Sequence, residues 1–190
     1  ASYFRENAAK WDVIRGLYMA NERVEQAMLA AAGDSVAEHL DIGTGTGQII
    51  RLLGGRVQHA LGVDASREML AVARANLESA DLAHCQVRQG DIMALPIADA
   101  VMDLVTIHHV LHFLDDPAAA VKEAARTLRA GSTALIVDFA PHSIDSLRDQ
   151  HAHRRLGFDD AEVRAWCHDA GLSDVHTQRF DNAARLGTQS

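Results

Sequence analysis

The chain has 190 residues, a formal net charge of -8 and two cysteines. This length is most simply one domain that buries its own core, and the acidic balance excludes a nucleic-acid backbone or an anionic membrane as the main partner, because both need clustered Lys and Arg. Cys85 and Cys167 lie far apart without CxxC spacing, so we expect neither a disulfide framework nor a zinc ribbon.

The first part of the chain is expected to be helical. Residues 3–32 contain one internal glycine and no proline, and their apolar side chains recur at mostly helical spacing. We therefore predict an N-terminal helical segment over residues 1–33, followed by a core over residues 34–190.

Beyond residue 33, short apolar runs alternate with amphipathic stretches. This order is typical of a parallel sheet with helices on both of its faces. The predicted strands are 38–42, 60–63, 85–87, 104–107 and 133–139, with a last strand at about 174–180. The polar tail that follows shows no convincing seventh strand.

The glycine-dense stretch LDIGTGTGQII, residues 40–50, turns an apolar strand into a loop that opens into a helix. Gly43, Gly45 and Gly47 can take backbone angles closed to other residues and leave no Cβ in the way of a ligand. The dinucleotide-binding fingerprint needs glycine at its sixth position, where this chain has Gln48. The chain instead has an acidic residue, Asp41, two positions before the first of three glycines that occupy every second position.

Acidic residues follow the second and third predicted strands. GVDAS places Asp64 twenty-one residues after Gly43, a spacing at which a carboxylate accepts hydrogen bonds from both ribose hydroxyls. The alternative role of Asp64, a helix cap, is already filled by Ser66. GDIMALP places Asp91 after the third strand, where it either makes a turn or contacts a ligand. Because parallel strands end at one edge of a sheet, these groups should line one site.

The helices that follow the second, fourth and fifth strands carry start and stop signals. Each begins at a Ser or Asp that can cap it, and one has a proline in its first turn. The first helix is expected from Ser66 to Ser79. The second begins at Asp116 and Pro117, continues from Ala118 to Leu128 and is ended by Gly131 near the C′ position, and the third begins at Asp159 or Asp160 and is terminated by Gly171.

The fourth strand leads into VTIHHVLHFLDDP, in which His108 lies closest to the strand end. If the next segment is helical, His109 and His112 share one face, and two histidines on one face would bind zinc. The sequence shows neither a third ligand nor an HExxH pattern, so we expect no metal site. A general base is the alternative, because imidazole titrates near neutral pH. Asp138, after the fifth strand, is expected on the substrate side of the same pocket.

Taken in chain order, six segments resemble the motifs of class I S-adenosylmethionine (SAM) dependent methyltransferases of the methyltransferase-11 type. They are YFRENAAKWD, DIGTGTG, GVDAS, GDIMALP, HHVLHFLDDP and LRAGSTALIVDF. More narrowly, VDFAPH and QHAHRRLGF are similar to the methyltransferase domain fused behind arsenical-repressor-type winged-helix regulators. The resemblance implies a mostly parallel, Rossmann-like α/β sheet, SAM as cofactor and S-adenosylhomocysteine (SAH) as product.

The resemblance also implies roles for residues. Asp64 would bind the ribose, Asp91 and the backbone N–H of Ile92 would bracket the adenine, and the N-terminal segment would close over SAM as a lid. His108, His109 and Asp138 are the candidate catalytic residues. The expected cofactor contacts are Tyr3, Trp11, Asp41, Gly43, Thr44, Gly45, Gly47, Asp64, Ala65, Met69, Asp91, Ile92 and His108.

We therefore expect a cytoplasmic methyltransferase that acts on a small-molecule acceptor, as a monomer or homodimer, without direct nucleic-acid contact. No apolar run reaches the roughly 20 residues of a membrane span, and no basic-then-apolar signal pattern opens the chain. Two alternatives stay open: a non-catalytic SAM-sensing domain of a transcriptional regulator, and an NAD-dependent oxidoreductase, against which Gln48 counts. The two cysteines match no position used by arsenite methyltransferases, so arsenic chemistry is not expected.

Overall fold

Five parallel strands form the centre of the part of the chain that the structure, a computed structural model, describes: residues 22–142 and 154–180. The strands are β1 (Val36–Ile42), β2 (Val57–Asp64), β3 (Cys85–Gln89), β4 (Met102–His108) and β5 (Leu128–Val137). Their order in the sheet is β3-β2-β1-β4-β5, and each neighbouring pair is parallel. The chain therefore has the predicted Rossmann-like α/β fold.

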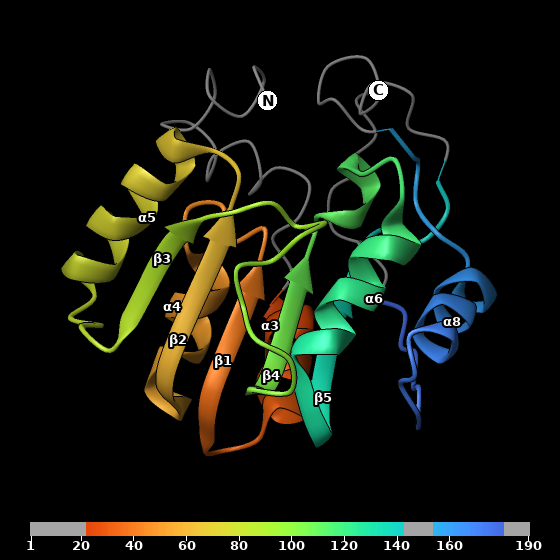
Figure 1. Cartoon of the computed structure of the whole chain (residues 1–190), viewed down its shortest axis with the longest axis horizontal. Helices are drawn as coiled ribbons and strands as arrows, with labels where there is room; N and C mark the ends of the chain where they lie inside the picture. The colour runs from red at the N-terminus through yellow and green to blue at the C-terminus, as the bar shows by residue number, and fades with distance from the viewer. Residues whose placement is uncertain (1–21, 143–153, 181–190) are drawn as a thin grey trace, which may run out of the picture.

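Helices cover both faces of this sheet, as the alternation in the sequence predicts (Figure 1). The helices α3 (Glu22–Ala32) and α4 (Gln48–Leu53) lie behind the sheet in this view, and α6 (Pro117–Thr127) and α8 (Asp160–Asp169) lie on the opposite side. The helix α5 (Arg67–Ser79) packs beside β3 and β2. Two short 3-10 turns, η2 (Gly54–Arg56) and η3 (Leu111–Phe113), complete the described elements.

The strands are apolar along their length because both of their faces are covered. One apolar cluster joins the strands to α6, with Ile42 and Ile107 fully buried against Val121. The other cluster joins them to α3 and α4, through Met28 and Leu53. Burial on both sides leaves the ends of the strands as the place where polar groups can meet.

The predicted helix starts are confirmed by their capping bonds. The hydroxyl of Ser66 accepts a hydrogen bond from the backbone N–H of Met69 at 3.2 Å, and α5 begins at the next residue. The carboxylate of Asp116 accepts one from Ala119 at 3.0 Å, with Pro117 in the first turn of α6. These local bonds satisfy N–H groups that a helix start otherwise leaves without a partner.

The predicted extent of α6, to Leu128, agrees with the structure to within one residue, but Gly131 does not end the helix. The helix ends at Thr127, and β5 begins at Leu128, which pairs with Met102 of β4. Gly131 lies inside β5 with φ +79°, next to the register shift between Met102 and Leu104. Pairing with β4 therefore ends the helix, and the glycine serves the irregular strand that follows.

The last predicted strand, 174–180, is also wrong. These residues form no strand, and they are held against helix α8 instead. Arg164 of α8 donates to the backbone carbonyl of Val175 at 2.5 Å and to the hydroxyl of Thr177 at 2.8 Å. Arg179 forms an ion pair with Asp160 at the start of the same helix.

The N-terminal prediction is tested only in part. Helix α3 agrees with the end of the predicted helical segment, whereas residues 1–21 lie outside the described part of the chain. No helix within residues 22–142 and 154–180 combines the length and apolar character needed to cross a membrane.

Candidate cofactor and acceptor site

The candidate site lies at the carboxyl edge of the sheet, where the strand order reverses between β1 and β4. Ligands of open α/β sheets bind at such switch points. The polar groups singled out in the sequence follow four of the strands at this edge: the glycine loop after β1, Asp64 at the end of β2, Asp91 after β3, and His108 at the end of β4.

The glycine loop is held by backbone bonds to the neighbouring strand. The N–H groups of Gly43 and Thr44 both donate to the carbonyl of Val63, at 2.8 and 3.1 Å. Gly43 has φ +68°, and a Cβ there would lie 2.5 Å from a methyl of Val110, the residue that follows the β4 histidines. Glycine is therefore required at this position both for the backbone angle and for close packing against the end of β4.

Asp64 joins the end of β2 to this loop. One carboxylate oxygen accepts the N–H of Gly45 at 2.9 Å and the other accepts that of Ser66 at 2.8 Å. Burial raises the pKa of the carboxyl, while the backbone N–H groups of Ser66, Gly45 and Ala65 act in the opposite direction. Those N–H groups use three of roughly four acceptor positions of a carboxylate, so capacity for a ligand hydroxyl remains.

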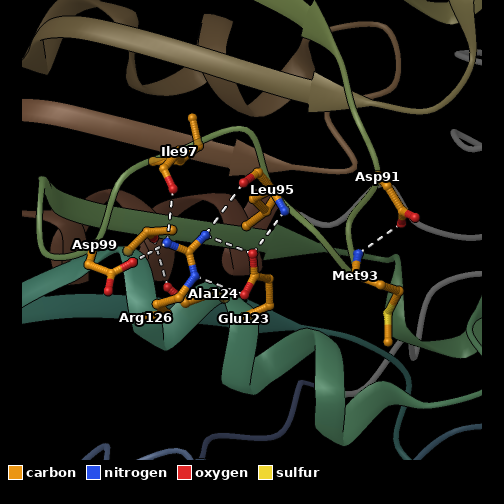
Figure 2. Close-up of polar contacts among 9 residues, drawn as sticks. Asp91, Met93, Leu95, Ile97, Asp99, Glu123, Ala124 and Arg126 are labelled. Atoms are coloured by element: carbon orange, nitrogen blue, oxygen red, sulfur yellow. Dashed lines mark hydrogen bonds and ion pairs between the residues drawn. The ribbon is translucent and has the colours of Figure 1, made fainter.

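Asp91 lies exposed in the loop that leads from β3 to β4. Its carboxylate accepts the N–H of Met93 at 2.9 Å, so it makes the turn that the sequence offered as one alternative (Figure 2). Gly90 donates its N–H to the carbonyl of Asp64 at 3.0 Å, which places the start of this loop beside the end of β2. Ile92 is half-buried next to Asp91.

Arg126 of α6 holds the far part of the same loop, a role that the sequence did not suggest (Figure 2). It donates to the carbonyl of Ile97 at 2.9 Å and forms an ion pair with Asp99. It also bonds Glu123 at 2.7 and 2.9 Å, and Glu123 in turn accepts the N–H of Leu95 at 2.8 Å. These partners raise the pKa of the guanidinium, which stays charged.

Asp41 is buried beneath the glycine loop, with 1% of its surface exposed. It accepts the hydroxyl of Thr106 at 2.6 Å, and the same hydroxyl lies 2.8 Å from Nε2 of His39. Burial raises the pKa of Asp41 to about 6, and a neighbouring charge on Asp64 adds to the rise. Burial lowers the pKa of His39 to about 4.

Two more of the predicted contact residues have covered side chains. Thr44 is 6% exposed and Met69 is 2% exposed. Tyr3 and Trp11 lie outside the described residues. The remaining predicted cofactor contacts, including Ala65, lie at or just after the carboxyl ends of β1, β2, β3 or β4.

The ends of β4 and β5 bring the histidines together with Asp138. The carboxylate of Asp138 accepts Nδ1–H of His112 at 2.7 Å and the N–H groups of Leu111 and Phe139 at 2.9 and 2.8 Å. The His109 ring lies 4.5 Å from that of His108, measured between ring centres. His112 is fully buried, whereas His108 and His109 are half-buried.

The charge state of Asp138 follows from these partners. Burial alone would raise the pKa of its carboxyl, but the charge and hydrogen bond of His112, the charge of His109 and the Phe139 N–H outweigh burial and lower it. Asp138 is therefore a buried carboxylate that is ionised at neutral pH. The pairing with His112 is the contact that the sequence did not suggest, because the two residues come from different strand ends.

The segment after β4 is not the regular helix that the histidine spacing assumed. It is the 3-10 turn η3, and His109 ahead of it has φ +55°. His109 donates its N–H to the carbonyl of Val137 at 2.8 Å, a bond that holds this turn against β5. The left-handed backbone is costly for a non-glycine residue and is concentrated at functional sites.

Comparison with known proteins gives the same family in sequence and in structure. The family model described as "Methyltransferase domain" matches residues 40–136. The chain is 32% identical over 123 residues to the "Uncharacterized methyltransferase YcgJ" of Bacillus subtilis, across 63% of this chain and 49% of that protein. It is 30% identical over 143 residues to a demethylmenaquinone methyltransferase of Thermus thermophilus, across 73% of this chain and 64% of the relative.

The solved structures that resemble the chain cover more of it. The crystal structure of the Bacillus subtilis protein YcgJ superposes with a TM-score of 0.72 and 27% identity, over 79% of this chain and 68% of that one. The structure described as "Complex between the Haloferax volcanii Trm112 methyltransferase activator and the putative methyltransferase" gives a TM-score of 0.74 at 24% identity, over 88% of this chain and 75% of that one, which is a likeness of fold alone. The alignment with YcgJ spans about half the length of that curated relative.

Proposed function

The chain belongs to the methyltransferase domain family, and from this premise we propose that it transfers a methyl group from SAM to a small-molecule acceptor. The observation that carries the proposal is the bond between the glycine loop and Asp64, from Gly45 N–H to the carboxylate at 2.9 Å. It joins the two sequence features that SAM recognition requires at one edge of the sheet. The absence of glycine at position 48 argues against a dinucleotide in the same place.

The residues present fit SAM at this edge. The Asp64 carboxylate keeps acceptor capacity for a ribose hydroxyl, while Asp91 and the N–H of Ile92 would meet the adenine. Gly43, Gly45 and Gly47 would face the methionine part, and His108 would lie at its reacting end. Residues 1–33 would form a lid over it, with Tyr3 and Trp11 in contact with the cofactor.

When bound, SAM supplies a methyl group on a positively charged sulfur that takes back the electron pair of the broken bond. The chain's own task is to hold the acceptor in line with this group and to exclude water, an orientation effect worth about 7 to 11 kcal/mol at best. An oxygen or nitrogen acceptor must also lose a proton. His108 and His109 are the candidates to remove it, and Asp138 would act on His109 through its negative charge.

Isothermal titration with SAM and SAH tests the cofactor assignment. We expect binding of both in the micromolar range, and no binding of NADH. Failure of SAM and SAH to bind would contradict the proposal. Quenching of tryptophan fluorescence by NADH but not by SAM would instead favour the oxidoreductase.

Turnover then separates an enzyme from a sensor. Production of SAH with small phenol, amine and thiol acceptors is expected in a mass-spectrometric assay. Tight SAM binding with no turnover against any of them would favour a SAM-sensing domain, in line with the similarity to domains fused to arsenical-repressor-type regulators.

A further inference from the structure

His109, His112 and Asp138 gather at the carboxyl ends of two adjacent strands. His109 follows β4, His112 lies in η3, and Asp138 follows β5. One potential ligand atom from each of the three side chains lies within 4.8 Å of the other two. The sequence offered two histidines with no third ligand, and the fold supplies Asp138, which lies 26 residues after His112 and follows the next strand.

The backbone holds the three residues in place. His108 pairs with Val137 in the β4–β5 register, so the two strands end side by side. The N–H of His109 donates to Val137 and the N–H of Leu111 donates to Asp138, so the turn after β4 is fastened to β5 at two points. A group of side chains fixed this way loses little freedom when it binds a ligand.

We propose that His109, His112 and Asp138 bind a divalent transition-metal ion, with zinc as the preferred ion. Two imidazole nitrogens and one carboxylate oxygen form a ligand set that zinc and ferrous iron accept in proteins. Three protein ligands leave a position open, as catalytic zinc sites do. The His112 ring is fully buried and Asp138 is nearly so, which shields such a site from water.

The charges suit an ion of this kind. Among the described residues, the hydrogen bonds that Asp138 accepts come from one imidazole and two backbone N–H groups. No Lys or Arg side chain ion-pairs with Asp138 among the contacts of the described residues. A divalent cation would add the positive charge that a buried carboxylate favours.

Binding requires a small movement of His109 and the loss of the Nδ1 proton that His112 donates to Asp138. Ligand atoms around a tetrahedral zinc lie roughly 3.3 Å apart, given zinc–nitrogen distances of about 2.0 Å. The 2.7 Å contact between His112 and Asp138 must therefore open slightly, whereas the His109 atom must close by up to about 1.5 Å from the 4.8 Å limit. His109 is the half-buried member, and its ring lies 6.2 Å from that of His112 between centres, so rotation of His109 can supply the movement.

The role of the ion in methyl transfer rests on the proposed function, whereas its binding does not. At the open position the ion would hold an acceptor oxygen and lower the pKa of its hydroxyl. The hydroxyl proton would go to His108, the remaining candidate base, while the oxygen forms the bond to the methyl carbon and the electron pair of the broken carbon–sulfur bond goes to sulfur. His109 and Asp138 then act on the acceptor through the ion.

Zinc titration of the chelator-treated chain tests the site. We expect the wild-type protein to bind one zinc ion that His109→Asn weakens tenfold or more, because removing a ligand costs at least as much as removing a group that orients one. Asparagine tolerates the left-handed backbone at this position, so the variant isolates the imidazole. Asp138→Asn is the second variant, and it should weaken zinc by a similar factor.

The matched control is His59→Ala, which removes an exposed histidine on β2 that pairs only with Glu38 among the described contacts. It should bind zinc as the wild type does. Cobalt(II) gives an independent reading: its visible absorption should report a four-coordinate site in the wild type and disappear in His109→Asn.

A wild-type chain that binds no stoichiometric zinc overturns the proposal. So does equal zinc affinity in folded His109→Asn and wild type, which would assign the ion to other histidines. SAH titration of the metal-free chain keeps the two proposals apart. SAH binding without zinc binding removes the metal site alone, and zinc binding without SAH binding removes the proposed function alone.

Discussion

Asp64 has two tasks at the residue scale, because the carboxylate proposed to bind ribose also holds the glycine loop. Its two oxygens bond Gly45 and Ser66, so removing the carboxylate releases the loop as well as the ligand. The spacing from Gly43 predicts the role in ribose binding, whereas the bond to the glycine loop is seen only in the folded chain.

Asp64→Ala should weaken SAH binding by about 1.5 to 3 kcal/mol, the usual value of hydrogen bonds to a charged group. Isothermal titration measures the change. Asp34→Ala, which removes an exposed carboxylate ahead of β1, is the control and should bind SAH like the wild type. Unchanged affinity in Asp64→Ala would mean that the ribose lies elsewhere.

Asp41 and His39 form a buried pair whose protonation shifts oppose each other. The raised pKa of Asp41 gives stability that is present below about 4 and lost as the pH rises through about 6. The lowered pKa of His39 gives stability that is present above 6.5 and lost as the pH falls through about 4. Between these limits the folded and unfolded states hold the same number of protons on the pair, so its net contribution is flat.

The substitution Asp41→Asn should make the effect of His39 on the pH dependence of stability measurable. The variant's free energy of unfolding should rise with pH between about 4 and 6.5, more steeply than in the wild type by about 1.4 kcal/mol per pH unit. Urea unfolding across this pH range measures the slope. Parallel curves for variant and wild type would show that Asp41 keeps its ordinary pKa in the folded chain, and a flat curve for the variant would show the same for His39.

At the scale of elements, α6 controls the loop between β3 and β4. Arg126 and Glu123 bond the backbone of this loop at Leu95 and Ile97, and Ala100 donates its N–H to the carbonyl of Arg126 at 3.0 Å. Asp91, proposed to meet adenine, starts the same loop. The helix would therefore position the proposed adenine contact through this loop.

Arg126→Ala should loosen this loop and weaken SAH binding several-fold. We expect the free energy of unfolding to fall by about 1 to 2 kcal/mol, because the carbonyl and carboxylate partners lose their donor. Urea unfolding and SAH titration measure the two effects. Arg129→Ala, which removes a neighbouring arginine paired with Asp103, is the control. Equal SAH affinity in all three proteins would remove α6 from cofactor binding.

The predicted elements differ from the structure where long-range contacts decide. The capping signals at Ser66 and Asp116 predict helix starts because a cap is a contact within three residues, and Asp159 precedes α8 as predicted but makes no side-chain capping bond. Gly131 does not end α6, because Leu128 already pairs with β4. The segment near residue 175 lacks a strand because Arg164 engages it.

At the scale of the whole molecule, binding of SAH should stabilise the folded chain by mass action. At 100 times its dissociation constant, SAH adds about 2.7 kcal/mol to the free energy of unfolding. This corresponds to a rise in Tm of roughly 5 to 10 °C for a chain of this size. A thermal melt measures it, with NADH at the same concentration as the control. No shift with SAH would contradict SAM as cofactor.

The amino-acid sequence alone predicts the parallel α/β fold and the class of cofactor expected for it. These follow from the strand–loop–helix alternation and from the spacing of Asp64 behind the glycines, both of which depend on short stretches of chain. The family match over residues 40–136 confirms the methyltransferase family.

The contacts between polar groups that are distant in the sequence depend on how the strands are arranged in the fold. Asp41 bonds Thr106 because β1 and β4 are neighbours, and Asp138 bonds His112 because β4 and β5 end together. Strand order and register fix such contacts, and both depend on how the whole sheet buries its two apolar faces. The glycine loop thus points to a cofactor from sequence, whereas the histidine and aspartate cluster beside it exists only in the folded chain.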